Sequence, residues 1–158
     1  MEYRKLGKTN LMVSSIGMGG IPIQRVGVDK AEELINFALD QGINFFDTAR
    51  GYTDSEKKFG KVFRKRGSEA IIATKSMARS KKGIMQDIEI SLEKMQVDVI
   101  DLYQLHNVKS MEVLEEVLDP EGALAGLKKA KEQGKIKHIG ITGHVPEVLF
   151  RALETGEF

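Results

Sequence analysis

The fold is decided by residues 70–106, AIIATKSMARSKKGIMQDIEISLEKMQVDVIDLYQLH. Short apolar runs open and close this stretch, at Ala70–Lys75 and Val99–His106. Their high content of Ile, Val and Leu indicates strands that are buried on both faces, as in a parallel sheet. Between them, Lys82–Met95 carries apolar residues at helical spacing. The stretch therefore predicts a strand–helix–strand unit whose two strands belong to one parallel sheet.

The same alternation continues in both directions along the chain. Further strands are predicted at Ser15–Met18, Asn44–Asp47 and Ile136–Thr142. The other predicted helices are Asp29–Asp40, a segment capped by Asp54 and running through Arg66, a short piece ending at Leu118, Ala123–Glu132 and Pro146–Glu154. Tyr3–Leu6 and Leu11–Ser14 predict a β-hairpin ahead of the first repeat. No linker interrupts the pattern, which predicts a single domain over residues 1–158.

The spacing of the predicted strand ends indicates the architecture. The ends at Gly19, Asp47, Lys75, His106 and about Thr142 are separated by 28, 28, 31 and 36 residues. A repeat of ~30 residues is what an eight-fold β/α barrel of ~250 residues requires. A doubly wound open sheet is the alternative, but its Gly-rich phosphate turn is not completed after Gly17-Met18-Gly19-Gly20. The sequence predicts an α/β fold of the TIM-barrel family, here a partial barrel of about five βα units.

The composition is typical of one compact globular domain. The 158 residues are 41% hydrophobic and 30% charged, and 24 Lys and Arg balance 23 Asp and Glu. So small a basic excess argues against a nucleic-acid partner, and no apolar run approaches the ~18 residues of a membrane span. The chain has no cysteine, which excludes disulfides and thiolate nucleophiles within it. Because the charged start also lacks the apolar core of a signal peptide, we expect a cytoplasmic protein.

Four titratable residues are expected at one rim of the barrel. A β/α barrel places its active site at the carboxyl ends of its strands. Asp47, Lys75 and His106 should therefore lie together, with Tyr52 in the loop that follows Asp47. Each residue alone is as readily structural: a turn-forming Asp, a solvated Lys, a packed Tyr or a hydrogen-bonded His. Their coincidence on one rim favours a catalytic site, and we predict no metal site.

This combination of groups suits proton transfer to an oxygen atom. The ordinary pKa of a tyrosine, about 10, is too high for efficient proton transfer near neutral pH. A neighbouring ammonium favours the phenolate, and a carboxylate keeps that ammonium charged and in place. A histidine can polarise a carbonyl by donating a hydrogen bond to its oxygen. Because the chain offers no thiolate and no metal-ligand cluster, a hydride for the carbonyl carbon would come from an organic cofactor.

At these residues the chain resembles the aldo-keto reductase superfamily. The resemblance rests on segments along the whole chain: Gly42-Ile43-Asn44-Phe45-Phe46-Asp47-Thr48-Ala49-Arg50-Gly51-Tyr52, Ile71-Ile72-Ala73-Thr74-Lys75, Asp101-Leu102-Tyr103-Gln104-Leu105-His106 and Lys135-Ile136-Lys137-His138-Ile139-Gly140-Ile141-Thr142. It implies an NAD(P)H-dependent reductase of aldehydes or ketones, with NADP as cofactor and NAD as the alternative. Tyr52 would be the general acid, Lys75 and Asp47 its tuning pair, and His106 the residue that orients the substrate carbonyl.

The resemblance also implies where cofactor and substrate bind. Gly19 and Gly20 would lie near the nicotinamide ribose, and Thr142 would bind the cofactor where the family often has a serine. His106 and His144 are the candidate substrate-binding residues. The sequence Thr142-Gly143-His144 is similar to a prokaryotic subgroup whose longer members append an iron–sulfur domain. The nearby basic residues Arg79, Lys81 and Lys82 are expected to be solvated.

Members of the family are about twice as long as this chain, so the resemblance identifies it as an N-terminal half. Five strands cannot close an eight-stranded barrel, and we expect open sheet edges, self-association and no measurable reductase activity from the 158 residues alone. Two other functions remain open: a lyase in which Lys75 forms a Schiff base with its substrate, and a non-catalytic fragment that keeps the four residues without turnover.

Overall fold

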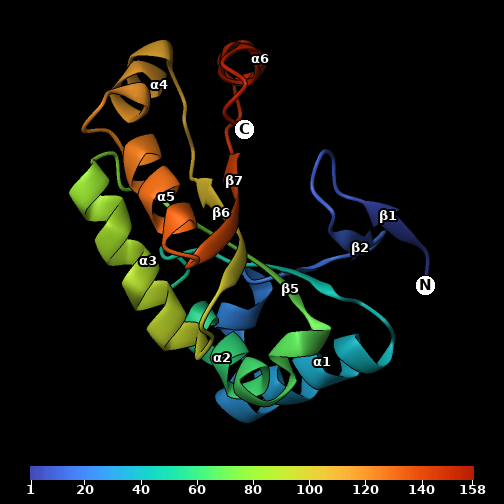
Figure 1. The fold of residues 1–158 in the computed structure, drawn as a ribbon. Helices are drawn as coiled ribbons and strands as arrows, with labels where there is room; N and C mark the ends of the chain where they lie inside the picture. Colours follow the sequence, from blue (N-terminus) through green and yellow to red (C-terminus); the bar gives the residue numbers. More distant parts are fainter.

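A computed structural model describes residues 1–158 as a five-stranded parallel sheet with helices on its outer side and a separate hairpin (Figure 1). The strands of the sheet follow one another in the order of the chain: β3 (Met18–Gly19), β4 (Phe45–Asp47), β5 (Ile71–Ser76), β6 (Ile100–Leu105) and β7 (Ile136–Ile141). The hairpin consists of β1 (Tyr3–Lys5) and β2 (Met12–Ser14), which pair antiparallel. The predicted hairpin and parallel sheet are confirmed.

Helices lie between successive strands and cover one face of the sheet, and one more helix follows the last strand. They are α1 (Val28–Asp40), α2 (Ser55–Arg66), α3 (Lys81–Met95), α4 (Met111–Leu118), α5 (Ala123–Glu132) and α6 (Pro146–Glu154), with short 3₁₀ turns η1 (Pro22–Arg25) and η2 (Gly67–Glu69). Helix α3 lies between α2 and α5, and packs against both. The apolar core fills the space between these helices and the strands, with Phe46, Phe59 and Ile88 fully buried. None of the helices is long and apolar enough to cross a membrane.

Two predicted details differ from the structure. Strand β3 is Met18–Gly19 rather than Ser15–Met18, because the Ser15 amide still bonds Glu2 beside the hairpin and only the two later residues pair with β4. Asp54 occupies the predicted N-cap position of α2, but its side chain makes no capping hydrogen bond. Its carboxylate forms an ion pair with Lys58 Nζ at 2.9 Å instead.

The close crossing of α2 and α3 depends on Gly60. A Cβ atom at this position would lie 2.2 Å from the Lys94 carbonyl oxygen and 2.9 Å from the Met95 backbone. Main-chain atoms cannot rotate away from a clash as a flexible side chain can, so any side chain at residue 60 would push the two helices apart.

We expect Gly60→Ala to lower the free energy of unfolding by about 2 kcal/mol, because overpacking outweighs the ~1 kcal/mol gained in helix propensity. Urea denaturation monitored by circular dichroism measures the change. Gly19→Ala is the matched control, since no atom lies within 4 Å of a Cβ at that site. Equal denaturation midpoints for the two variants would contradict the packing argument.

The sheet is open at both ends, because β3 and β7 each have only one neighbour. Helix α6 adds exposed apolar side chains, including Phe150 at 68% and Leu153 at 57% exposure. Open strand edges and apolar surface favour association. We therefore expect sedimentation to show dimers or larger species at micromolar concentration. The double variant Phe150→Lys/Leu153→Lys should weaken the part contributed by α6. A compact monomer at every concentration would contradict the expectation.

Candidate active site

The carboxyl ends of three neighbouring strands bring the predicted polar residues together. In the parallel register, Asp47 pairs with Ala73 on β5, and Lys75 pairs with Gln104 on β6. Because side chains alternate along a strand, Lys75 points to the inner face, while Thr74 and Ser76 point outward and contact helices α2 and α3. The alternation of side chains therefore places Lys75 on the same face of the sheet as the Asp47 carboxylate.

An ion pair between Lys75 and Asp47 forms the centre of the rim. The Lys75 ammonium donates to Asp47 Oδ2 at 2.5 Å and to the Thr48 carbonyl at 2.9 Å. The Lys75 side chain is only 7% exposed, whereas Asp47 is 37% exposed. Gln104 Nε2 donates to the other carboxylate oxygen at 3.2 Å. Sequence reasoning missed Gln104, although a polar residue at an inward position of an apolar strand was a usable signal.

Tyr52 and His106 lie beside this ion pair. The Tyr52 ring meets the His106 ring edge-on, with centroids 5.9 Å apart. Lys75 Nζ lies 5.0 Å from the centroid of the Tyr52 ring. The four residues predicted from the strand ends thus lie in one chain of neighbours: the Asp47 carboxylate pairs with the Lys75 ammonium, Lys75 lies beside the Tyr52 ring, and Tyr52 meets His106.

The loop that carries Tyr52 is held from its outer side by a buried polar network. The Arg50 amide bonds the Lys75 carbonyl at 2.9 Å, and the Arg50 guanidinium pairs with Glu56 at 2.7 Å. The Glu56 carboxylate, 2% exposed, also accepts bonds from Thr74 and Ser91. These contacts join the loop to α2, α3 and β5. Most of these contacts join residues that are far apart in the chain, so no local sequence pattern predicts them.

The predicted cofactor residues lie around the same rim. Gly19 is exposed next to Asp47, with no atom within 4 Å of where a Cβ would be. Gly20 is buried, and a Cβ there would meet Ser55 Oγ at 2.5 Å, so Gly20 is required for packing of the Tyr52 loop. The Thr142 hydroxyl bonds the Asn107 amide at 3.1 Å. Their assignment to cofactor binding stays a prediction, as does that of His144, which is exposed in the loop before α6.

Arg79 differs from the expectation that the basic loop is solvated. It is half-buried, and its guanidinium reaches from the β5–α3 loop to the carbonyl groups at the end of β6. The neighbouring Lys82 is exposed, as expected.

Burial lowers the pKa of His106, and the charge of Lys75 adds to this effect while Asp47 opposes it. The Nδ1 atom of His106 is buried without a hydrogen-bond partner. The imidazole is therefore neutral at neutral pH.

We expect the His106 ring protons to titrate by NMR with a midpoint below the ordinary value of 6.5. Because the unfolded chain would bind this proton at higher pH than the folded chain, stability is unaffected above ~6.5 and declines as pH falls below it. The loss is complete once the folded histidine is also protonated. In His106→Asn the decline should be shallower. A His106 midpoint at or above 6.5 would contradict this account.

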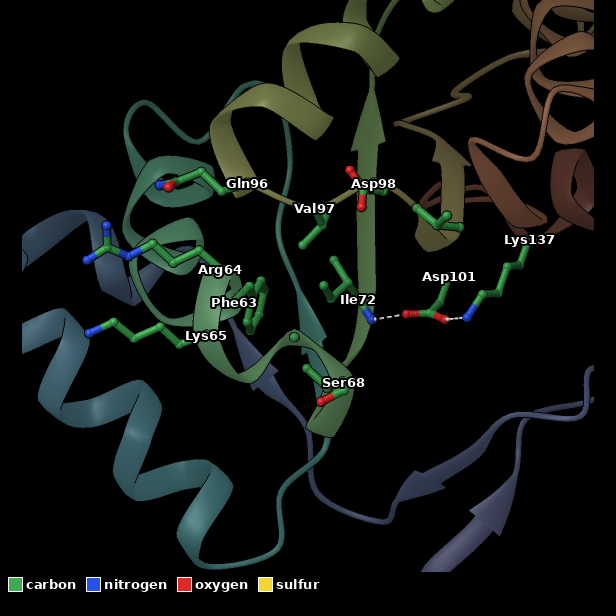
Figure 2. A pocket seen from close by; sticks show the side chains of 13 residues that line it. Phe63, Arg64, Lys65, Ser68, Ile72, Gln96, Val97, Asp98, Asp101 and Lys137 are labelled. Carbon is green, nitrogen blue, oxygen red and sulfur yellow. Dashed lines mark hydrogen bonds and ion pairs between the residues drawn. The ribbon is translucent and has the colours of Figure 1, made fainter.

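A hollow lies at the end of the sheet opposite the rim, near the amino ends of β5, β6 and β7 (Figure 2). Its buried acid, Asp101, accepts bonds from the Ile72 amide at 2.9 Å and from Lys137 at 2.7 Å. Figure 2 shows these two interactions along the edge of the hollow. Both carboxylate oxygens are satisfied within the sheet, which indicates a structural role. None of the predicted site residues lines it.

Comparison with known proteins shows the family to which the chain belongs. A family model described as "Aldo/keto reductase family" matches residues 15–158. The chain is 35% identical over 159 residues to L-galactose dehydrogenase of Arabidopsis thaliana, a match that covers 90% of this chain and 49% of that protein. It is 33% identical over 174 residues to aldo-keto reductase YhdN of Bacillus subtilis, covering 97% of this chain and 51% of that protein. The chain thus spans about half the length of these curated relatives.

Solved structures show the same arrangement of elements. The holo form of aldo-keto reductase AKR11C1 from Bacillus halodurans superimposes with a TM-score of 0.84 at 30% identity, covering 98% of this chain and 54% of that one. This likeness confirms the predicted partial (β/α)8 barrel. The family is shown by the match of its model over residues 15–158. The chain belongs to the aldo/keto reductase family, whose members are oxidoreductases.

Proposed function

We propose that the rim of this sheet is the acid–base centre of an NAD(P)H-dependent reductase that converts aldehydes or ketones to alcohols. The observation that carries the proposal is a nearly fully buried lysine, paired with a carboxylate, whose ammonium lies 5.0 Å from the ring centroid of a half-exposed tyrosine. Family membership supports oxidoreductase chemistry. The substrate class and the role of each residue are our inference.

In this proposal Tyr52 donates the proton that the carbonyl oxygen gains. The phenolate left behind is stabilised by the adjacent Lys75 ammonium, and it regains a proton from solvent after the product leaves. Asp47 holds Lys75 in place, since one of its oxygens accepts from the ammonium and the other from Gln104. The positive charge of Lys75 thus lies close to Tyr52, on whose oxygen negative charge develops in the reaction.

His106 orients the substrate carbonyl. A neutral imidazole carries one N–H, which can donate to the carbonyl oxygen without competing with Tyr52 for the proton. The low pKa of His106, caused by burial and by the charge of Lys75, keeps it in this form at neutral pH. His144 lies farther out on the same rim and would contact the substrate's remaining atoms.

The residues at the rim fit a reduced nicotinamide cofactor, and we propose NADPH, with NADH as the alternative. When bound, the nicotinamide supplies the hydride that the carbonyl carbon gains. Gly19 offers an open backbone surface beside Asp47 for the ribose, because no side chain occupies the space above it. Thr142 would contact the cofactor directly, whereas the buried Gly20 would act indirectly, because a side chain there would collide with Thr48 and Ser55.

A turnover assay tests the proposal. Because the chain spans about half of its relatives, residues 1–158 are joined to the second half of AKR11C1, the structural relative described above. We expect this chimera to oxidise NADPH only when an aldehyde or ketone is present. A chimera that binds NADPH yet reduces no member of a broad carbonyl panel would contradict the proposed function.

The Schiff-base alternative is disfavoured by the geometry of Lys75. A lysine that attacks a carbonyl needs a free amine with room to approach. The Lys75 ammonium instead donates to Asp47 and to the Thr48 carbonyl, and its side chain is nearly fully buried. Failure of borohydride to trap a substrate adduct on Lys75 is the expected result.

A further inference from the structure

Arg79 is a half-buried cation with no ion-pair partner. Its Nη2 atom donates to the carbonyl of His106 at 2.8 Å and to the carbonyl of Asn107 at 3.0 Å. Its Nη1 atom is buried without a hydrogen-bond partner. Burial lowers the pKa of the guanidinium, and the more distant charge of Glu116 only partly opposes this. Desolvating an arginine without a carboxylate in contact is costly, so its position calls for a reason.

The backbone that Arg79 contacts makes an uncommon turn. Asn107 has a φ of 54°, in the left-handed region that residues other than glycine rarely adopt. From the other side, the Thr142 hydroxyl accepts from the Asn107 amide at 3.1 Å, and the Thr142 carbonyl accepts from the Val108 amide at 2.8 Å. The end of β6 is therefore held between Arg79 on one side and Thr142 on the other.

We propose that Arg79 is a positioning residue that holds the carboxyl end of β6, and with it the His106 imidazole, in the geometry needed to bind a substrate carbonyl. This inference rests on the proposed function for the role of His106, but the brace itself is a property of the chain alone. A hydrogen bond from a charged donor to each of two successive carbonyls leaves the His106–Asn107 backbone little freedom to rotate.

The charge of Arg79 also acts on the imidazole. The titratable groups that face His106 are Asp47, Tyr52, Lys75, Arg79 and His144. Burial and the charge of Lys75 lower the pKa of His106 most. The charges of Arg79 and His144 lower it further, while that of Asp47 raises it. Removing Arg79 takes away a positive charge and admits water, and both changes favour protonation of His106.

The test compares Arg79→Met with the unaltered chain by NMR. We expect the titration midpoint of His106 to rise, and the Asn107 and Val108 amides to exchange with solvent about tenfold faster or more. Lys82→Met is the matched control, because it removes an exposed positive charge from the first turn of α3, three residues farther along the chain, without touching β6. It should change neither quantity. The proposal requires both changes in Arg79→Met, so absence of either overturns it.

Arg79→Lys serves if Arg79→Met does not fold. It keeps the charge, but its ammonium ends one bond short of the position of Arg79 Nη2, the atom that donates to both carbonyls. We expect a His106 midpoint close to that of the unaltered chain together with faster exchange at Asn107, and unchanged exchange would overturn the brace. Neither readout needs turnover. Failure of the brace is therefore distinguishable from failure of the proposed reductase function, which the chimera assay tests separately.

Discussion

Tyr52→Phe lowers the turnover rate of the chimera by about 10²-fold or more, the usual scale for loss of a positioned general acid. The substitution removes one hydroxyl and keeps the ring that packs edge-on against His106 at 5.9 Å. Binding of NADPH should therefore change little. Steady-state assays with a single aldehyde, together with fluorescence titration of the cofactor, measure the two effects separately.

Tyr3→Phe is the matched control for this result. Tyr3 lies on the hairpin, and its hydroxyl donates to the Gly42 carbonyl at 2.9 Å, away from the rim. Its removal should leave turnover near that of the parent chimera. Near-normal turnover in Tyr52→Phe would show that another group donates the proton.

Lys75→Met should cost a similar factor and also change the pH dependence of turnover. The ammonium beside Tyr52 is lost, so the phenolate formed in the reaction is no longer stabilised by a positive charge. Asp47 keeps only its bond from Gln104. Turnover measured across a range of pH shows both changes.

Lys58 provides a closely matched control for Lys75. It is also a buried lysine that pairs with a carboxylate, Asp54 at 2.9 Å, and donates to a backbone carbonyl, that of Ile23 at 3.0 Å. Both substitutions to Met should destabilise the fold, because each removes a buried ammonium from its hydrogen-bond partners. Only Lys75→Met should abolish most of the turnover. Equal losses of turnover in Lys75→Met and Lys58→Met would show that Lys75 has only a structural role.

The strand ends could be predicted because their signals are local. Lys75 and His106 each close an apolar run, and Asp47 and Tyr52 stand within one short segment, so parallel strands were enough to bring them together. Strand β3 was misplaced for a related reason. Its pairing extends over only two residues, which is too short for any periodicity to mark.

The supporting contacts could not be predicted, because they join residues that are distant in the chain. Arg79 reaches the backbone at residues 106 and 107, and Arg50 reaches Asp87. Whether an arginine is solvated or bridges two loops depends on the register of neighbouring strands. The sequence of a charged loop does not determine which of the two occurs. The prediction that Arg79 is solvated was wrong.

Deuterium transfer from the cofactor tests both the hydride source and the proton donor. The chimera is given NADPH labelled at the transferring position of the nicotinamide, and an aldehyde in ordinary water. We expect an alcohol with deuterium on the former carbonyl carbon, formed at least about 10²-fold more slowly in Tyr52→Phe at unchanged cofactor affinity. An alcohol without the label, or one formed equally fast by Tyr52→Phe, would contradict this expectation.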